Sequence, residues 1–295
     1  MKAGGARLLA LVLAGATGAI GLGFYLERAP RRLSPSAPAQ QPAELVPAAE
    51  LAADWCATGY QPIGNGCLAF AATADAPQPL IVYLHGRYAR DAPAEEVDRQ
   101  RRLGALATAR GFAVLALRGL LGECSAAELS AWFCWPSNEH NEDGAAAVVG
   151  TWAGVLAEAH RLTRSKTRFV LGFSNGAYFG GLLATHDLFE ADAFVIAHGG
   201  PVGSFESLPR TPPLLLLSAD DDIAQDDMIR LDGELTREHW PHDSYARAGA
   251  HGLTDGDIEA SLAFFARARE AVPLEPPLDL QRPVHHAHEP IAQKP

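Results

Sequence analysis

The sequence contains little positive charge for its size. Its 295 residues include 24 lysines and arginines against 35 aspartates and glutamates, which gives a formal net charge of −11. Nucleic acids and anionic lipid surfaces attract proteins through clusters of positive charge. The acidic balance therefore argues against a nucleic-acid partner and against docking on a membrane by charge. It leaves a membrane contact only through the N-terminal segment.

The sequence also lacks internal repeats and C-x-x-C redox motifs. Its four cysteines form two close pairs, Cys56 with Cys67 and Cys124 with Cys134. Four cysteines allow three pairings and the sequence does not choose among them, but a bridge within each close pair is the simplest expectation. The alternative is four buried free thiols, which are common in cytosolic enzymes. Disulfides would indicate a domain that works outside the cytoplasm.

Charge is absent from the apolar run between Leu8 and Leu26. Two interpretations of residues 1–28 stay open. They are either a cleaved secretory signal, with an A-x-A-like site at Ala14–Ala16, or an uncleaved anchor whose length nearly spans a bilayer. The run continues past Ala16, which slightly favours the anchor. Positive charges stand on both sides of the run and do not settle the orientation of an anchor. The cysteine pairs favour an extracytoplasmic protein, periplasmic or secreted, with or without an anchor at residues 8–26.

Low-complexity segments flank a single predicted domain. Residues 29–53 are rich in proline and alanine and predict an extended linker, because such a composition cannot bury a core. Residues 272–295 have the same character, and we expect a disordered tail, although its cluster of histidines could bind a metal ion. Between these segments, residues 54–271 are expected to form one domain.

Within residues 54–271, short apolar runs alternate with longer segments of helical periodicity. Continuously apolar runs are typical of strands buried on both faces of a parallel sheet. The alternation predicts an α/β protein with a mostly parallel, doubly wound sheet and helices on both faces. The predicted strands are 67–72, 80–84, 112–117, 168–171, 193–197, 214–217 and 243–247. The predicted helices are 95–110, 142–162, 177–184, 226–239 and 254–269.

The most informative motif is Gly172-Phe173-Ser174-Asn175-Gly176, which stands between a strand-like and a helix-like run. This is the pattern of a nucleophile elbow. A side chain two residues before or after the serine would collide with neighbouring backbone, and glycine has none. The turn would expose the Ser174 hydroxyl and place the backbone N–H of Asn175 at a helix N-terminus, where anions are favoured. The alternative is an ordinary glycine-rich turn.

A serine hydroxyl needs a base within hydrogen-bond reach and a third group that orients the base. In an open α/β sheet these groups lie on loops beyond the carboxyl ends of strands. One such loop carries His251 between two glycines, and another carries the adjacent candidates Asp220, Asp221 and Asp222. The order serine, aspartate, histidine is the one found in α/β-hydrolases. A calcium loop is a further alternative for the aspartates, but the spacing lacks the glycine and glutamate of an EF-hand.

An oxyanion hole requires two N–H donors. The first is expected to be the backbone N–H of Asn175. The strand at 81–84 runs into His85-Gly86, and the glycine allows a sharp turn, so the backbone N–H of Arg87 is the expected second donor. A plain strand-to-helix turn is the alternative interpretation of this segment.

Together these motifs resemble the α/β-hydrolase superfamily over about residues 65–270. The segments Leu84–Arg87 and Gly172–Ala177 resemble the esterase group of polyhydroxybutyrate depolymerases, feruloyl esterases and phospholipase/carboxylesterase proteins. That group carries its acid in a G-x-x-D loop. Ser218 stands in the place of the glycine here, so the resemblance implies Asp221 as the acid, ahead of Asp222 and Asp220.

The resemblance implies a serine-dependent carboxylic ester hydrolase that uses Ser174, Asp221 and His251 and forms an acyl-enzyme intermediate. It implies no cofactor and no metal, and a small-molecule or polymer ester as substrate. A serine peptidase of the same fold and a catalytically inactive tethered binding protein are the alternatives.

Aromatic residues gather around the second cysteine pair. Trp132, Phe133 and Trp135 stand between and beside Cys124 and Cys134. They could form an aromatic wall of the substrate pocket, or they could pack a loop that a disulfide holds. The sequence supports both interpretations equally.

Overall fold

The computed structural model describes residues 55–124, 126–137, 142–200, 205, 208 and 211–271. The predictions for the N-terminal segment, the linker and the tail lie outside these residues. Within the described ranges, none of the helices has the length and apolar character needed to cross a membrane. Residues 8–26, the candidate anchor, lie outside the described residues.

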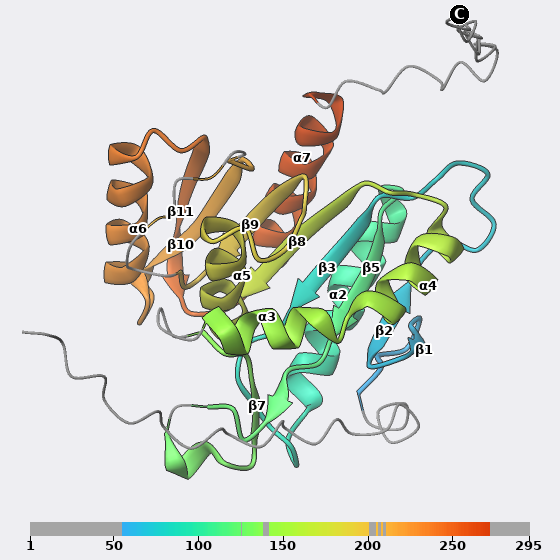
Figure 1. The fold of residues 1–295 in the computed structure, drawn as a ribbon, viewed down its shortest axis with the longest axis horizontal. Coiled ribbons are helices and arrows are strands. Elements are labelled where there is room, and N and C mark those ends of the chain that lie inside the picture. Colours follow the sequence, from blue (N-terminus) through green and yellow to red (C-terminus); the bar gives the residue numbers. More distant parts are fainter. Residues whose placement is uncertain are drawn as a thin grey trace, which may run out of the picture. The chain divides into compact units, whose positions relative to one another are not determined.

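The centre of the described domain is an eight-stranded sheet in the order β1-β2-β5-β3-β8-β9-β10-β11 (Figure 1). The pairs β1–β2 and β2–β5 are antiparallel, and every other neighbouring pair is parallel. This arrangement confirms the predicted fold class. The strands are β1 (Gln61–Ile63), β2 (Gly66–Ala69), β3 (Leu80–Leu84), β5 (Ala113–Leu117), β8 (Arg168–Phe173), β9 (Ala193–Ala197), β10 (Leu214–Asp221) and β11 (His242–Ala250).

Helices cover both faces of this sheet because its inner strands are apolar on both sides. In β3, Leu80 and Val82 point into one core, whereas Ile81 and Tyr83 point into the other. The first core is closed by α3 (Glu142–Gly150), α4 (Ala153–Thr163), α5 (Asn175–Thr185) and α6 (Gln225–Arg237). The second core is closed by α2 (Ala94–Ala109) and α7 (Asp255–Ala271).

The single helix predicted over 142–162 is wrong, because α3 and α4 are separate helices. Between them the N–H groups of Thr151 and Trp152 donate three residues back, at 3.0 and 2.9 Å, which tightens the chain into a turn. Glycine at position 150 lowers the helix propensity of this stretch. The turn seats the buried Trp152 ring edge-on against Phe179, with centroids 6.0 Å apart. Tertiary packing therefore interrupts a periodicity that looks continuous in sequence.

A second, three-stranded sheet was not predicted, because its strands are only two or three residues long. Its order is β4-β7-β6, with β4 (Tyr88–Ala89), β6 (Leu120–Leu121) and β7 (Trp132–Cys134). A short 3₁₀ helix, Ala127–Leu129, precedes β7. The expected bridges Cys56–Cys67 and Cys124–Cys134 are both confirmed. The first attaches the start of the described chain to β2, and the second attaches the loop after β6 to β7.

Candidate active site

Ser174 lies in a strained turn between β8 and α5. Its backbone has φ 53° and ψ −121°, a region that a residue with a side chain rarely adopts. A Cβ atom on Gly176 would lie 2.1 Å from the carbonyl oxygen of Leu84, and one on Gly172 would lie 2.3 Å from the carbonyl oxygen of Gly176. Both glycines of the motif are therefore required by close backbone contact, as the sequence predicted.

A chain of two hydrogen bonds connects Ser174, His251 and Asp222. The distance from Ser174 Oγ to His251 Nε2 is 2.9 Å, and the distance from His251 Nδ1 to Asp222 Oδ1 is 2.8 Å. An ionised carboxylate can only accept, so Nδ1 carries the proton and Nε2 is left to accept from the serine hydroxyl. Each of the three residues directly follows a strand: Ser174 follows β8, Asp222 follows β10 and His251 follows β11. In the sheet, β9 lies between β8 and β10, and β11 lies on the other side of β10.

The acid position expected from the sequence needs a correction from Asp221 to Asp222. The carboxylate that meets His251 is that of Asp222, whereas Asp221 is the exposed last residue of β10. The pairing of the two strands is irregular just before this point: Ala219 pairs with Arg247 and Asp221 pairs with Ala250, so the extra residue lies in β11. Asp220 accepts the backbone N–H of Gly249 at 2.6 Å. The three adjacent aspartates thus have three different environments.

Asp222 is held as an anion by its hydrogen bonds. Burial by itself would raise its pKa, but bonds from the Ala224 N–H, His251 and His198 outweigh that effect and lower the pKa below its ordinary value. Oδ1 accepts from the Ala224 N–H at 2.8 Å, and the side chain is fully shielded from solvent. A permanently charged carboxylate is suited to orient an imidazole and to stabilise its protonated form.

His198 is a residue at this site that the sequence analysis missed. It directly follows β9, is fully buried, and its Nδ1 lies 2.5 Å from Asp222 Oδ2. Its position was the available signal. His198 stands at the carboxyl end of the strand between those of Ser174 and Asp222. The carboxyl ends of parallel strands lie at one edge of the sheet, so all three residues lie at that edge. His198, Asp222 and His251 also form the one group of potential metal ligands in the described chain, with donor atoms within 4.8 Å of one another. The hydrogen bonds among them account for this clustering.

The expected oxyanion loop lies directly against the serine. A Cβ atom on Gly86 would be 3.1 Å from Ser174 Cβ, so only glycine allows this approach without displacement. The Arg87 side chain is exposed. Asn175 is the first residue of α5, and the N–H groups of a first helical turn have no partner within the helix.

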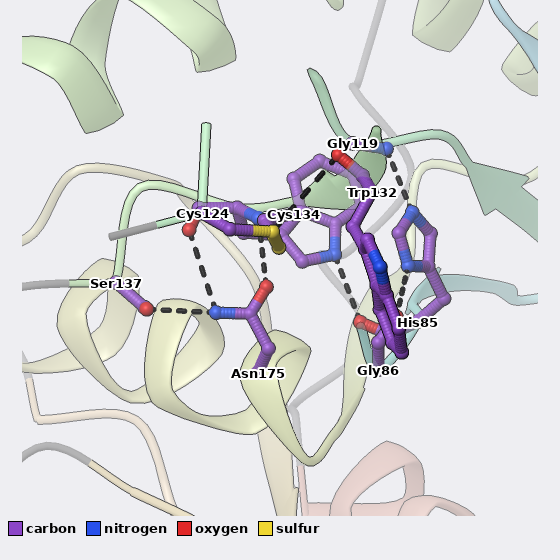
Figure 2. The surroundings of a disulfide bond; sticks show 9 residues. His85, Gly86, Gly119, Cys124, Trp132, Cys134, Ser137 and Asn175 are labelled. Atoms are coloured by element: carbon purple, nitrogen blue, oxygen red, sulfur yellow. Dashed lines mark hydrogen bonds between the residues drawn. A yellow bond between two sulfur atoms is a disulfide. The ribbon is translucent and has the colours of Figure 1, made fainter. Parts of the chain in front are cut away.

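His85 fixes this loop as a neutral imidazole. Burial lowers the pKa of His85 to about 3. Its Nδ1 donates to the Gly86 carbonyl at 2.6 Å, and its Nε2 accepts from the Gly119 N–H at 2.8 Å (Figure 2). A protonated ring would turn the second contact into two opposed donors, so the geometry requires the neutral form.

The Asn175 side chain connects the elbow to the loop after β7. Its Oδ1 accepts from the Trp135 backbone N–H at 2.7 Å. Its Nδ2 donates to Ser137 Oγ at 2.8 Å (Figure 2). The Trp135 indole N–H in turn donates to the His85 carbonyl at 3.0 Å. The segment held by the Cys124–Cys134 bridge therefore contacts both loops that are expected to supply oxyanion donors.

The aromatic residues near that bridge are mostly in the core. Trp135 is 1% exposed and stacks on Phe179, and Phe133 is 4% exposed with the Arg118 guanidinium 3.9 Å from its ring centre. The packing interpretation describes these two residues better than a substrate wall does. Trp132 is partly exposed, so it alone of the three can present a substantial surface.

Comparisons with known proteins support the fold. No family model and no curated protein matches the chain. A Bacillus cereus carboxylesterase superposes with a TM-score of 0.52 at 16% identity, over 69% of this chain and 93% of the other. The protein YahD, solved with malic acid, superposes with a TM-score of 0.51 at 18% identity, over 69% and 99%. At these identities the likeness establishes the α/β-hydrolase fold.

Proposed function

We propose that the protein hydrolyses carboxylic esters with Ser174 as nucleophile, His251 as base and Asp222 as the acid that orients the base. The observation that supports this proposal is the continuous contact from Ser174 Oγ through the His251 ring to Asp222. An esterase among the proteins of similar fold agrees with it. The fold hosts many activities, so the argument rests on the site.

In the proposed reaction, His251 Nε2 takes the hydroxyl proton while Ser174 Oγ attacks the ester carbonyl carbon. The backbone N–H groups of Asn175 and Arg87 would stabilise the oxyanion of the tetrahedral intermediate. The bond to the alcohol oxygen then breaks, and His251 returns its proton to that oxygen. Water, activated by His251 in the same way, attacks the acyl-enzyme and releases the acid. No step requires a cofactor.

We further propose that this domain works outside the cytoplasm, periplasmic or secreted, on a small-molecule or polymer ester. Its two disulfides support this, because structural disulfides persist in oxidising compartments.

The test compares the wild type with Ser174→Ala and with Ser244→Ala, an exposed serine near the start of β11. We expect turnover of p-nitrophenyl acetate or butyrate and labelling by a fluorophosphonate in the wild type and in Ser244→Ala. Both should be lost in Ser174→Ala. Turnover that survives in Ser174→Ala would refute the assignment of the nucleophile, and amide cleavage without ester cleavage would favour a peptidase.

A further inference from the structure

The second carboxylate oxygen of Asp222 has its own buried partner. Oδ1 faces His251, and Oδ2 lies 2.5 Å from His198 Nδ1. The side chains of His198 and Asp222 are both fully shielded from solvent. Because the carboxylate can only accept, His198 Nδ1 carries the proton in this contact. The acid of the proposed triad is thus held between two imidazoles.

The far side of the His198 ring is also occupied. Its Nε2 lies 3.4 Å from Asp257 Oδ2 and 3.4 Å from Arg247 Nη2. Arg247 Nε donates to both oxygens of the buried Asp257, at 3.1 and 3.0 Å. Asp257 is itself fixed at the start of α7, where it accepts from the N–H and the hydroxyl of Thr254 at 2.8 and 2.7 Å.

Arg247 connects this cluster to the loop that carries the base. Its Nη2 donates to the carbonyl of Gly252 at 2.6 Å and to that of Ala250 at 3.3 Å. These carbonyls flank His251 on both sides. His198, Asp257 and Arg247 therefore connect Asp222 to the backbone of the loop that carries His251. Together with the direct contact between His251 and Asp222, these contacts form a closed ring.

The backbone of His198 indicates that its side chain is needed there. It has φ 61°, a left-handed conformation that favours glycine and is tolerated by asparagine, aspartate and histidine. Glycine would satisfy this turn with less strain. A buried histidine in a strained conformation, with charged or polar groups against both ring nitrogens, is the pattern expected where the side chain has a task.

We propose that His198 is a positioning residue for the acid–base pair, an inference that rests on the proposed esterase function. Its Nδ1–H holds Asp222 so that Oδ1 faces His251, while Asp257 and Arg247 hold the His198 ring and the His251 loop in one arrangement.

The inference has a consequence for the protonation of His251. The described titratable and charged groups that face this cluster are Asp222, Asp257, Arg247, His251 and Tyr178. The His198 donor withdraws negative charge from the Asp222 carboxylate. Without that donor, the carboxylate attracts the protonated His251 more strongly, so His251 keeps its proton to higher pH. A residue that only fills space would not produce this shift.

Two variants separate the effect of the His198 N–H donor from the effect of the volume of the side chain. His198→Asn retains an N–H donor near the position of Nδ1 and tolerates the left-handed backbone, whereas His198→Leu fills the site without a donor. We expect an NMR titration of His251, assigned with His251→Gln, to show a higher midpoint in His198→Leu than in the wild type. His198→Asn should titrate like the wild type. Equal midpoints in all three proteins would overturn the inference.

A second signal does not require the leucine variant to fold. The His198 Nδ1–H of the wild type should give a downfield, slowly exchanging proton resonance that disappears in His198→Asn. Its absence from the wild type spectrum overturns the inference. If His198→Leu does not fold, His198→Gly takes its place in the titration, because glycine adopts this backbone without strain.

Kinetics then distinguish the inference from the proposed function. We expect kcat for a p-nitrophenyl ester to fall about 10- to 100-fold in His198→Leu with little change in KM, as for other groups that orient a reactive side chain. His198→Asn should restore most of it. A wild type without esterase activity but with the NMR shift refutes the function and supports the positioning. An active wild type with neither effect refutes the positioning alone.

Discussion

The backbone N–H of Trp135 donates to Asn175 Oδ1 at 2.7 Å, across 40 positions of sequence. Asn175 directly follows the proposed nucleophile, and Trp135 directly follows the disulfide-bonded Cys134. This contact joins the Ser174 turn beside the large sheet to the segment that follows the small sheet. It makes the precision of the proposed oxyanion hole depend on a segment that is short, irregular and covalently held.

Asn175→Ala should destabilise the protein by about 1–3 kcal/mol, because it leaves the buried Trp135 N–H without an acceptor. Ser137→Ala removes one of two acceptors of Asn175 Nδ2, which also donates to the Trp135 carbonyl at 3.4 Å, and should have a smaller effect. Urea unfolding of both variants measures the difference. Equal destabilisation by the two substitutions would contradict the importance of the Trp135 contact.

The two disulfides should contribute similarly to stability but differently to kcat. They close loops of similar length, with separations of 11 and 10 residues, so removing either should destabilise the fold by about 2–4 kcal/mol. Only Cys124–Cys134 holds the segment that contacts Asn175 and His85. We therefore expect Cys124→Ser/Cys134→Ser to lower kcat at a temperature where the protein stays folded, and Cys56→Ser/Cys67→Ser to leave it near the wild-type value.

Melting curves for both pairs provide the control for this comparison. A loss of kcat of the same size in both double variants, at equal stability, would contradict a special role of the bridge beside the site.

Asp222→Asn should reduce kcat by about 10⁴-fold, because an amide favours the wrong tautomer of the base. Asp221→Asn changes an exposed neighbour of the same chemistry and should keep nearly full activity. Steady-state kinetics with a p-nitrophenyl ester tests the pair. The reverse result would restore the assignment that the G-x-x-D resemblance suggested.

Glu96 should make the stability of the protein fall as the pH rises. Burial raises the pKa of Glu96 from 4.5 to about 7, although the positive charge of Arg99 acts to lower it. Between these pH values the folded protein holds a proton that the unfolded chain has released. The stabilisation that this proton provides is therefore fully present below about pH 4.5 and is lost as the pH rises through 7. The loss reaches about 3 kcal/mol at most.

Glu96→Gln cannot ionise and should show a smaller decline between pH 5 and 7.5 in urea unfolding. Glu95→Gln, which alters the exposed neighbour, should follow the wild type. A wild-type profile parallel to that of Glu96→Gln would show that Glu96 titrates at its ordinary pH.

Much of the fold was predictable because it depends on local patterns. The apolar runs of β3 and β9 end where the sequence placed them, since strands buried on both faces need continuous apolar residues. The split between α3 and α4 was not predictable, because it depends on where the Trp152 ring packs. The small sheet was missed for a related reason: strands of two or three residues carry no periodicity.

Of the candidate site, the sequence alone determined the elbow and the histidine, because glycine spacing and loop position are local properties. The choice among three adjacent aspartates was decided by the tertiary structure, since only the fold shows which carboxylate reaches the His251 ring, and that carboxylate is Asp222. The same is true of His198, which reaches Asp222 only because β9 lies between β8 and β10 in the sheet. Adjacency of strands is a property of the assembled sheet, and no single segment encodes it.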